Sequence, residues 1–198
     1  GGMVHFVLGN HELMILDNNN LYINEKYRHV ESAAGTDYSR LFNGSSVLGR
    51  WIRTRPVMIK IDDILFAHGG ISAAMARRCM PVEQINQIFC DNLSRHPSSE
   101  KTNAGDLTFL NEESGPVWYR GYFTDNTLCE NTVDSILTFY GSRHIVVGHT
   151  PHAGITSLFG GKIIGADTGD KRRRDEILII RDGIFYRSYL NGRRSRIE

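Results

Sequence analysis

The sequence predicts an α/β fold in which short buried strands alternate with amphipathic helices. Short apolar runs such as residues 4–8 end at glycine, as strands buried on both faces do. Longer segments such as residues 82–93 place their apolar side chains on one helical face. Near the end of the chain, Asp182-Gly183 separates two apolar runs and is typical of a hairpin turn between antiparallel strands. Together these patterns favour sheets with helices packed on their outer faces.

The predicted strands are apolar runs bounded by glycine or by tight turns. The turn at Asp62-Asp63 separates two of them, and Asp182-Gly183 separates the last two. In chain order they are residues 4–8, 57–61, 64–67, 144–147, 162–166, 177–181 and 184–189.

The predicted helices begin or end at residues that favour helix boundaries. Pro56 follows the second helix, Pro81 suits the first turn of the third, and Gly141 ends the last. The predicted helices are residues 12–17, 46–53, 82–93 and 132–140, while residues 96–106 are polar and predicted to be irregular.

Composition and charge exclude several function classes. The 198 residues suffice for one sizeable domain with a core, and 40% are apolar and 23% charged. The net charge of +1 gives no electrostatic argument for a nucleic-acid or anionic membrane partner. The basic run at residues 171–174 meets acidic residues at once and is predicted to be a solvated loop. No apolar stretch is long enough to span a bilayer.

Three cysteines, Cys79, Cys90 and Cys129, are odd in number and have no CxxC spacing. We predict reduced and mostly buried thiols rather than a disulfide or a zinc site. This favours a reducing compartment, and the sequence leaves both the cytoplasm and the periplasm open.

Three predicted strands end in the same way. Residues 9–12 read Gly-Asn-His-Glu, residues 68–70 read His-Gly-Gly, and residues 148–150 read Gly-His-Thr. Polar sites of α/β folds collect at the carboxyl ends of strands, and imidazole with amide oxygen suits Mn, Fe or Zn. A single histidine of this kind is usually a hydrogen-bonded strand-end residue, but three repeats favour a metal site. His152, beyond Pro151, is predicted to be supporting or structural.

The motifs GNHE, HGG and GHT, in this order, resemble those of the calcineurin-like metallophosphoesterases. Within that family the chain is similar to the PPP-type protein phosphatases, especially the Shewanella-like bacterial branch, and GPVWYRGY at residues 115–122 adds to this similarity. The resemblance implies a sandwich of two mixed β-sheets flanked by helices, forming a single domain over residues 1–198. It also implies metal-dependent hydrolysis of phosphate esters, most similar to that of serine/threonine-type phosphomonoesterases.

The resemblance further implies the metal site. Asn10, His68 and His149 would bind one divalent ion, and the intact family holds two such ions, with Mn, Fe or Zn as candidates. Asp167, in ADTG after a predicted strand, would support the site or cap the backbone.

The catalytic residues are implied in the same way. His11 would protonate the leaving oxygen, and Glu12 would hold a neighbouring group in place. Arg120 would bind the phosphoryl oxygens through its planar fork. The alternative for Arg120 is a surface arginine stacked on an aromatic ring.

The family's GDxHG and GDxxDRG motifs, which lie upstream of GNHE, do not occur in this sequence. We therefore expect an N-terminally incomplete domain that lacks its first strands and helices, binds one metal ion or none, and has impaired activity. An apolar flank would be exposed and could favour self-association. The aspartates considered as replacements sit in turn or loop contexts without the GD pattern: Asp37, Asp62, Asp63, Asp106 and Asp170.

The expected substrate is a phosphorylated protein or a small phosphate ester. One alternative is a diadenosine-polyphosphate or other nucleotide hydrolase, since GHTP and HGG occur there too. An alternative of another class is a non-catalytic binding or scaffold domain on the same fold. Two bound metal equivalents would favour the enzyme, and one or none the scaffold.

Overall fold

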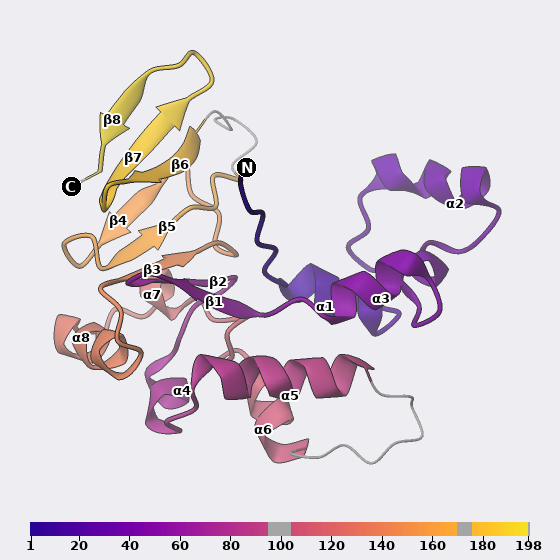
Figure 1. Cartoon of the computed structure of the whole chain (residues 1–198), viewed down its shortest axis with the longest axis horizontal. Helices are drawn as coiled ribbons and strands as arrows, with labels where there is room; N and C mark the ends of the chain where they lie inside the picture. The colour runs from indigo at the N-terminus through magenta and orange to yellow at the C-terminus, as the bar shows by residue number, and fades with distance from the viewer. Residues whose placement is uncertain (95–103, 170–175, 198) are drawn as a thin grey trace.

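The computed structural model describes residues 1–94, 104–169 and 176–197. Its centre is a five-stranded mixed sheet with the order β1-β2-β3-β5-β4, beside a three-stranded antiparallel sheet with the order β6-β7-β8 (Figure 1). The strands are β1 Met58–Ile61, β2 Ile64–Ala67, β3 His144–Val147, β4 Thr156–Leu158, β5 Ile163–Gly165, β6 Glu176–Arg181, β7 Ile184–Tyr189 and β8 Arg194–Arg196.

Strands β2, β3 and β5 run parallel in register, so their carboxyl ends share one edge of the sheet. Ala67 pairs with Val147, and Val147 pairs with Gly165. The residues that follow β2 and β3 are therefore neighbours, although the two strands lie far apart in the sequence.

Helices α4, α5, α6 and α8 lie on one side of the five-stranded sheet and the three-stranded sheet lies on the other (Figure 1). The segment with α1 to α3 projects from the edge near β1 (Figure 1). The helices are α1 Asn10–Leu16, α2 Arg28–Ala34, α3 Val47–Arg53, α4 Ala73–Arg77, α5 Val82–Ser94, α6 Ala104–Leu110, α7 Gly121–Thr124 and α8 Glu130–Phe139, with 3-10 turns η1 Glu25–Tyr27 and η2 Tyr38–Phe42.

The side chains of β3 alternate between two hydrophobic cores. Ile145 and Val147 belong to the larger core, which includes residues of α5, α6 and α8. Val146 belongs to the smaller core, where it joins Phe185 of the second sheet. Because successive strand residues face opposite ways, one strand supports both layers. The predicted α/β sandwich is confirmed, although β6 to β8 are antiparallel rather than mixed.

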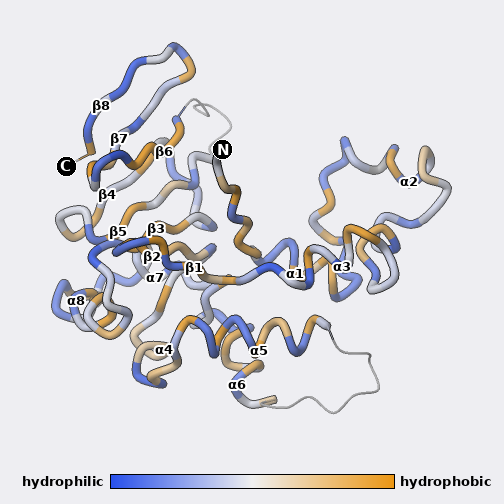
Figure 2. Tube along the Cα trace, viewed as in Figure 1, coloured by the Kyte–Doolittle hydropathy of each residue, from blue (hydrophilic) through white to orange (hydrophobic). Residues whose placement is uncertain are grey.

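The predicted strand at residues 4–8 is wrong. This segment belongs to no sheet, and among its described backbone bonds the Leu8 N–H donates to the Pro56 carbonyl at 2.9 Å. Leu8 is fully buried while Val4 is 95% exposed, and the stretch before α1 is largely hydrophobic (Figure 2). An apolar run becomes a strand only where another strand pairs with it, and no such partner lies beside this one in the described chain.

Two further predictions are wrong in part, and others fall outside the described residues. Residues 104–106 are helical rather than irregular, so Asp106 lies in the first turn of α6, where it pairs with Arg78 at 2.8 Å. The three cysteines are free, but Cys79 and Cys129 are exposed, contrary to the expected burial, and Cys90 is partly buried. The predicted loop at residues 171–174, Asp170 and residues 96–103 lie outside the described residues. No described helix is long and apolar enough to cross a membrane.

Candidate functional site

Three polar side chains from distant parts of the chain meet at the carboxyl edge of the central sheet. The Nε2 atom of His68, after β2, lies 2.8 Å from Oδ1 of Asn10, in the first turn of α1. The same nitrogen lies 3.1 Å from Nδ1 of His149, after β3. The structure thus brings together the three residues that the sequence analysis grouped as metal ligands.

The backbone explains how these side chains approach so closely. The Gly148 N–H donates to the His68 carbonyl at 2.8 Å, which continues the pairing of β2 and β3 past their last residues. His149 then adopts a left-handed backbone with φ of +64°, which is uncommon for a residue other than glycine. At Gly9, a Cβ atom would stand 2.7 Å from Nδ1 of His68, so only glycine lets α1 begin this near the imidazole.

Burial sets the charge state of the two histidines. It lowers the pKa of His68 to about 4, with Asp167 opposing the shift and His11 and Arg120 adding to it. Burial likewise lowers the pKa of His149 to about 4, with Arg120 as the next largest cause. Both imidazoles are therefore neutral at pH 7, the form that coordinates a metal ion.

Arg120 reaches this site from the segment before α7. Its Nη1 atom donates to the His149 carbonyl oxygen at 2.5 Å and lies 3.4 Å from Oγ1 of Thr150. The side chain is exposed, so part of the guanidinium faces solvent beside the imidazoles. The geometry places Arg120 at the cluster rather than on a remote surface.

His11 follows Asn10 and lies on the outer side of the cluster. Its ring is exposed and stacks on Tyr22, with centroids 5.4 Å apart and planes 11° apart. Its charge acts on His68. Glu12 instead accepts a hydrogen bond from the Gly9 N–H at 2.8 Å, so it caps the start of α1 and fixes the turn that carries Asn10 and His11.

Asp167 and His152 lie on the β5 side of the cluster. Oδ1 of Asp167 accepts a hydrogen bond from the Gly169 N–H at 2.9 Å, and its charge raises the pKa of both His68 and His149 against the effect of burial. The His152 ring packs against Phe123 with centroids 4.3 Å apart, and its backbone N–H donates to the Asp167 carbonyl at 2.9 Å.

The sequence analysis missed how the segment carrying Arg120 is fastened to the one carrying His68. The Gly69 and Gly70 N–H groups both donate to the Pro116 carbonyl, at 2.7 and 3.2 Å. The Tyr122 hydroxyl donates to the Ile71 carbonyl at 2.9 Å and accepts from the Ile71 N–H at 3.1 Å. The aromatic run around Arg120 was the one sequence signal for this contact, and it did not identify the partner.

The family model for calcineurin-like phosphoesterases matches residues 2–153, which include Asn10, His68 and His149. The chain belongs to the calcineurin-like phosphoesterase family. The resemblance predicted from GNHE, HGG and GHT is thereby confirmed.

Solved structures extend this assignment. This calcineurin-like phosphoesterase is similar to a cold-active protein tyrosine phosphatase, with 34% identity, a TM-score of 0.88, and coverage of 100% of this chain and 58% of the other. A cold-active protein-tyrosine phosphatase of a psychrophilic Shewanella species gives 33% identity and the same TM-score, with 60% of its chain covered. The chain thus spans about three fifths of these relatives. A viral relative, the uncharacterised protein R398 of Acanthamoeba polyphaga mimivirus, is 28% identical over 177 residues, 76% of this chain and 70% of its own.

Calcineurin-like phosphoesterases generally bind divalent metal ions, and the donor atoms of this chain fit one. An amide oxygen and two neutral imidazole nitrogens are ligands that Mn, Fe and Zn accept, and three protein ligands with an open position are typical of catalytic sites. Within the described residues, no three His, Cys, Asp or Glu side chains form a group suited to a metal ion. Asn10 is therefore needed to complete a set of three ligands.

Proposed function

We propose that this chain hydrolyses phosphate monoesters, with Asn10, His68 and His149 as the ligands of a divalent ion. The observation that carries the proposal is the approach of Asn10 Oδ1 and His149 Nδ1 to within 2.8 and 3.1 Å of His68 Nε2. When bound, a divalent ion activates water and neutralises charge on the phosphoryl oxygens. Mn, Fe and Zn remain the candidate metals.

Arg120 and His11 supply the remaining chemistry in this proposal. Nη1 of Arg120 is tied to the His149 carbonyl, and no hydrogen bond of its Nε or Nη2 is found within the described chain, so these donors can contact phosphoryl oxygens. The oxygen of water forms the new bond to phosphorus as the bond to the leaving oxygen breaks, one proton of that water stays on the phosphate, and the other restores the proton that His11 donates. His11 gives its proton to that leaving oxygen, which departs as an alcohol or phenol.

Glu12 and Asp167 have positioning roles in this proposal. Glu12 holds the Gly9 N–H and so orients Asn10 and His11 on the first turn of α1. Asp167 adds negative charge beside the two histidines, and this charge favours a cation there. Neither side chain needs to contact the substrate.

We also propose that residues 1–198 form one domain, because one core contains residues from Leu8 to Ile163. The proposed substrate is a phosphorylated protein or a small phosphate ester. Support comes from the solved relatives, which are named protein tyrosine phosphatases.

The test is hydrolysis of p-nitrophenyl phosphate with and without added manganese. His68→Ala and His149→Ala should abolish both the metal-dependent activity and manganese binding. His29→Ala, which removes an exposed histidine of α2, is the matched control and should change neither. Manganese binding without hydrolysis of any phosphate ester would instead support the scaffold alternative.

A further inference from the structure

The three asparagines at residues 18–20 turn the chain back along α1. Asn18 lies just past the end of this helix and has a left-handed backbone with φ of +59°, which asparagine tolerates better than most residues. Oδ1 of Asn19 then accepts a hydrogen bond from the Leu21 N–H at 3.1 Å and so closes the turn. The reversal brings Tyr22 back to the first turn of α1.

Tyr22 stacks on the imidazole of His11. The two ring centroids are 5.4 Å apart and the planes differ by 11°. His11 is exposed, and within the described chain its ring makes neither a side-chain hydrogen bond nor a contact with a second aromatic ring. The stack with Tyr22 is therefore the contact that can fix the orientation of the imidazole.

Both rings border a cavity of about 430 Å³, the cavity beside His11. Its lining also includes Phe6 and Trp51, which meet edge to face with centroids 5.2 Å apart. Because open space lies beside the imidazole, packed side chains do not restrict its rotation on that side. Without Tyr22 the ring would sample more orientations.

We infer that Tyr22 is a positioning residue for His11 and holds the imidazole in the orientation that delivers a proton to the leaving oxygen. The inference rests on the proposed function. In that reaction the bond from phosphorus to the leaving oxygen breaks, its electron pair goes to that oxygen, and His11 supplies the proton that the oxygen takes up. An imidazole that is already oriented loses less rotational freedom in the transition state. Tyr22 acts through His11 and need not contact the substrate.

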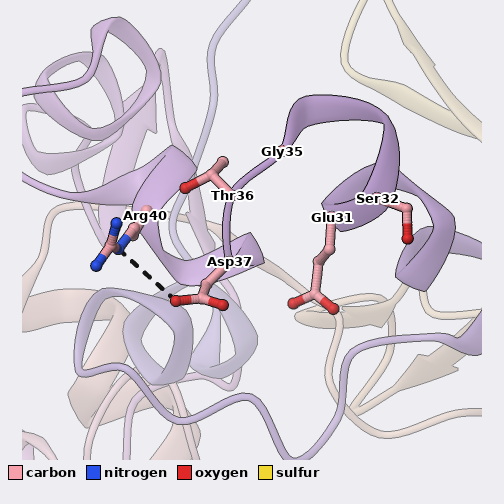
Figure 3. Close-up of a pocket in the computed structure, with 6 residues that line it drawn as sticks. All are labelled: Glu31, Ser32, Gly35, Thr36, Asp37 and Arg40. Carbon is pink, nitrogen blue, oxygen red and sulfur yellow. Dashed lines mark ion pairs between the residues drawn. The ribbon is translucent and has the colours of Figure 1, made fainter.

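A second hollow in the segment with α1 to α3 takes no part in this arrangement. It is lined by Glu31, Ser32, Gly35, Thr36, Asp37 and Arg40 (Figure 3). Arg40 lies 3.7 Å from Asp37 in an exposed ion pair, and neither the asparagine turn nor the proposed site contributes to the lining. The support of His11 is therefore assigned to Tyr22.

The first experiment compares kcat for phenyl phosphate and p-nitrophenyl phosphate in the manganese-loaded protein. Phenol is the poorer leaving group, so its ester depends more on proton transfer from His11. Tyr22→Leu should lower kcat for phenyl phosphate about 3- to 10-fold, the usual range for an aromatic pair. It should lower kcat for p-nitrophenyl phosphate much less and leave KM for both esters little changed. Tyr22→Phe keeps the ring and should retain the original activity.

Controls separate positioning from a general effect on the fold. Tyr22 is 62% exposed, so its replacement leaves the core intact. Tyr27→Leu removes another tyrosine of the cavity lining, 43% exposed, and should change neither kcat value. His11→Ala removes the proton donor, so adding Tyr22→Leu to it should cause no further loss with phenyl phosphate. An equal loss in both backgrounds would overturn the inference, because Tyr22 would then act without His11.

Proton NMR tests the stack without turnover. The imidazole signals that vanish in His11→Ala should shift in Tyr22→Leu, which lacks the ring current of the tyrosine, and stay nearly in place in Tyr22→Phe. Unchanged signals in Tyr22→Leu would refute the stack, whether or not an ester is hydrolysed. Failure to hydrolyse either ester would overturn the proposed function. Hydrolysis on which Tyr22→Leu has the same effect for both esters would overturn only the positioning role.

Discussion

Nη1 of Arg120 donates a hydrogen bond to the backbone carbonyl oxygen of His149 across 2.5 Å. His149 has a left-handed backbone, so this bond helps to hold an uncommon conformation while the rest of the guanidinium stays beside the imidazoles. One side chain thus links a proposed metal ligand to the proposed phosphate contact.

We expect Arg120→Ala to lower kcat/KM for an aryl phosphate about 10- to 100-fold, the usual range for a hydrogen bond to a charged group. KM should rise and kcat should fall. Arg120→Lys keeps the charge but loses the planar fork and should recover only part of the activity. Steady-state kinetics check this, with exposed Arg77→Ala as the control. Unchanged kinetics in Arg120→Ala would remove Arg120 from the site.

Gly9→Ala should disrupt the proposed metal site, although alanine can adopt the backbone conformation of Gly9. Gly9 has φ of −107° and ψ of −178°, which any residue adopts. The added Cβ would stand 2.7 to 2.9 Å from three atoms of the His68 ring, so the ring must move away from Asn10. Manganese affinity should fall by about tenfold or more, as when a supporting contact of a ligand is lost. Calorimetric titration measures this. Gly105→Ala in α6, where a Cβ meets nothing within 4 Å, should bind manganese normally.

Tyr122→Phe should lower the free energy of unfolding. The buried hydroxyl bonds to both the N–H and the carbonyl of Ile71, and its removal leaves both backbone groups without this partner. The expected loss is about 1 to 3 kcal/mol, measured by urea denaturation at fixed pH. Tyr22→Phe removes an exposed hydroxyl and should have little effect. If Tyr122→Phe and Tyr22→Phe were equally stable, the hydrogen bonds between Tyr122 and Ile71 would not hold the Arg120 segment against the His68 segment.

The stability of the metal-free protein should rise with pH between about 4 and 6.5. Burial lowers the pKa of His68 and His149 from 6.5 to about 4, so within this window the unfolded chain binds more protons than the folded one. Lowering the pH through the window therefore favours unfolding. Urea midpoints measured with a chelator at about pH 5 and about pH 7 check this. His68→Asn and His149→Asn should each flatten the dependence, and the exposed His29→Asn should not.

Local sequence patterns predicted much of the sheet, and the family resemblance implied the residues of the candidate site. The β3 and β7 strands have the bounds that their apolar runs indicated. The Asp182-Gly183 turn joins antiparallel strands, with φ of +53° and +71° at its two residues. The apolar runs that precede GNHE, HGG and GHT indicated a metal site, and the resemblance implied Asn10, His68 and His149 as its ligands. Parallel pairing of β2 with β3 places the two histidines at one edge.

Features that depend on tertiary partners could not be predicted in this way. Residues 4–8 have the pattern of a strand, but Val4 is exposed and no described strand pairs with it. The cavity beside His11 exists because Phe6, Tyr22 and Trp51 from separate segments line one space, and no local pattern encodes that arrangement. The bond between Tyr122 and Ile71 likewise joins residues 51 positions apart.

The most direct test of the central claim is a crystal structure of the protein soaked with manganese, examined by anomalous scattering. We expect an anomalous peak within about 2.0 to 2.3 Å of Asn10 Oδ1, His68 Nε2 and His149 Nδ1. A peak away from these atoms, or none in crystals of protein that needs manganese for phosphatase activity, would contradict the assignment of the metal site.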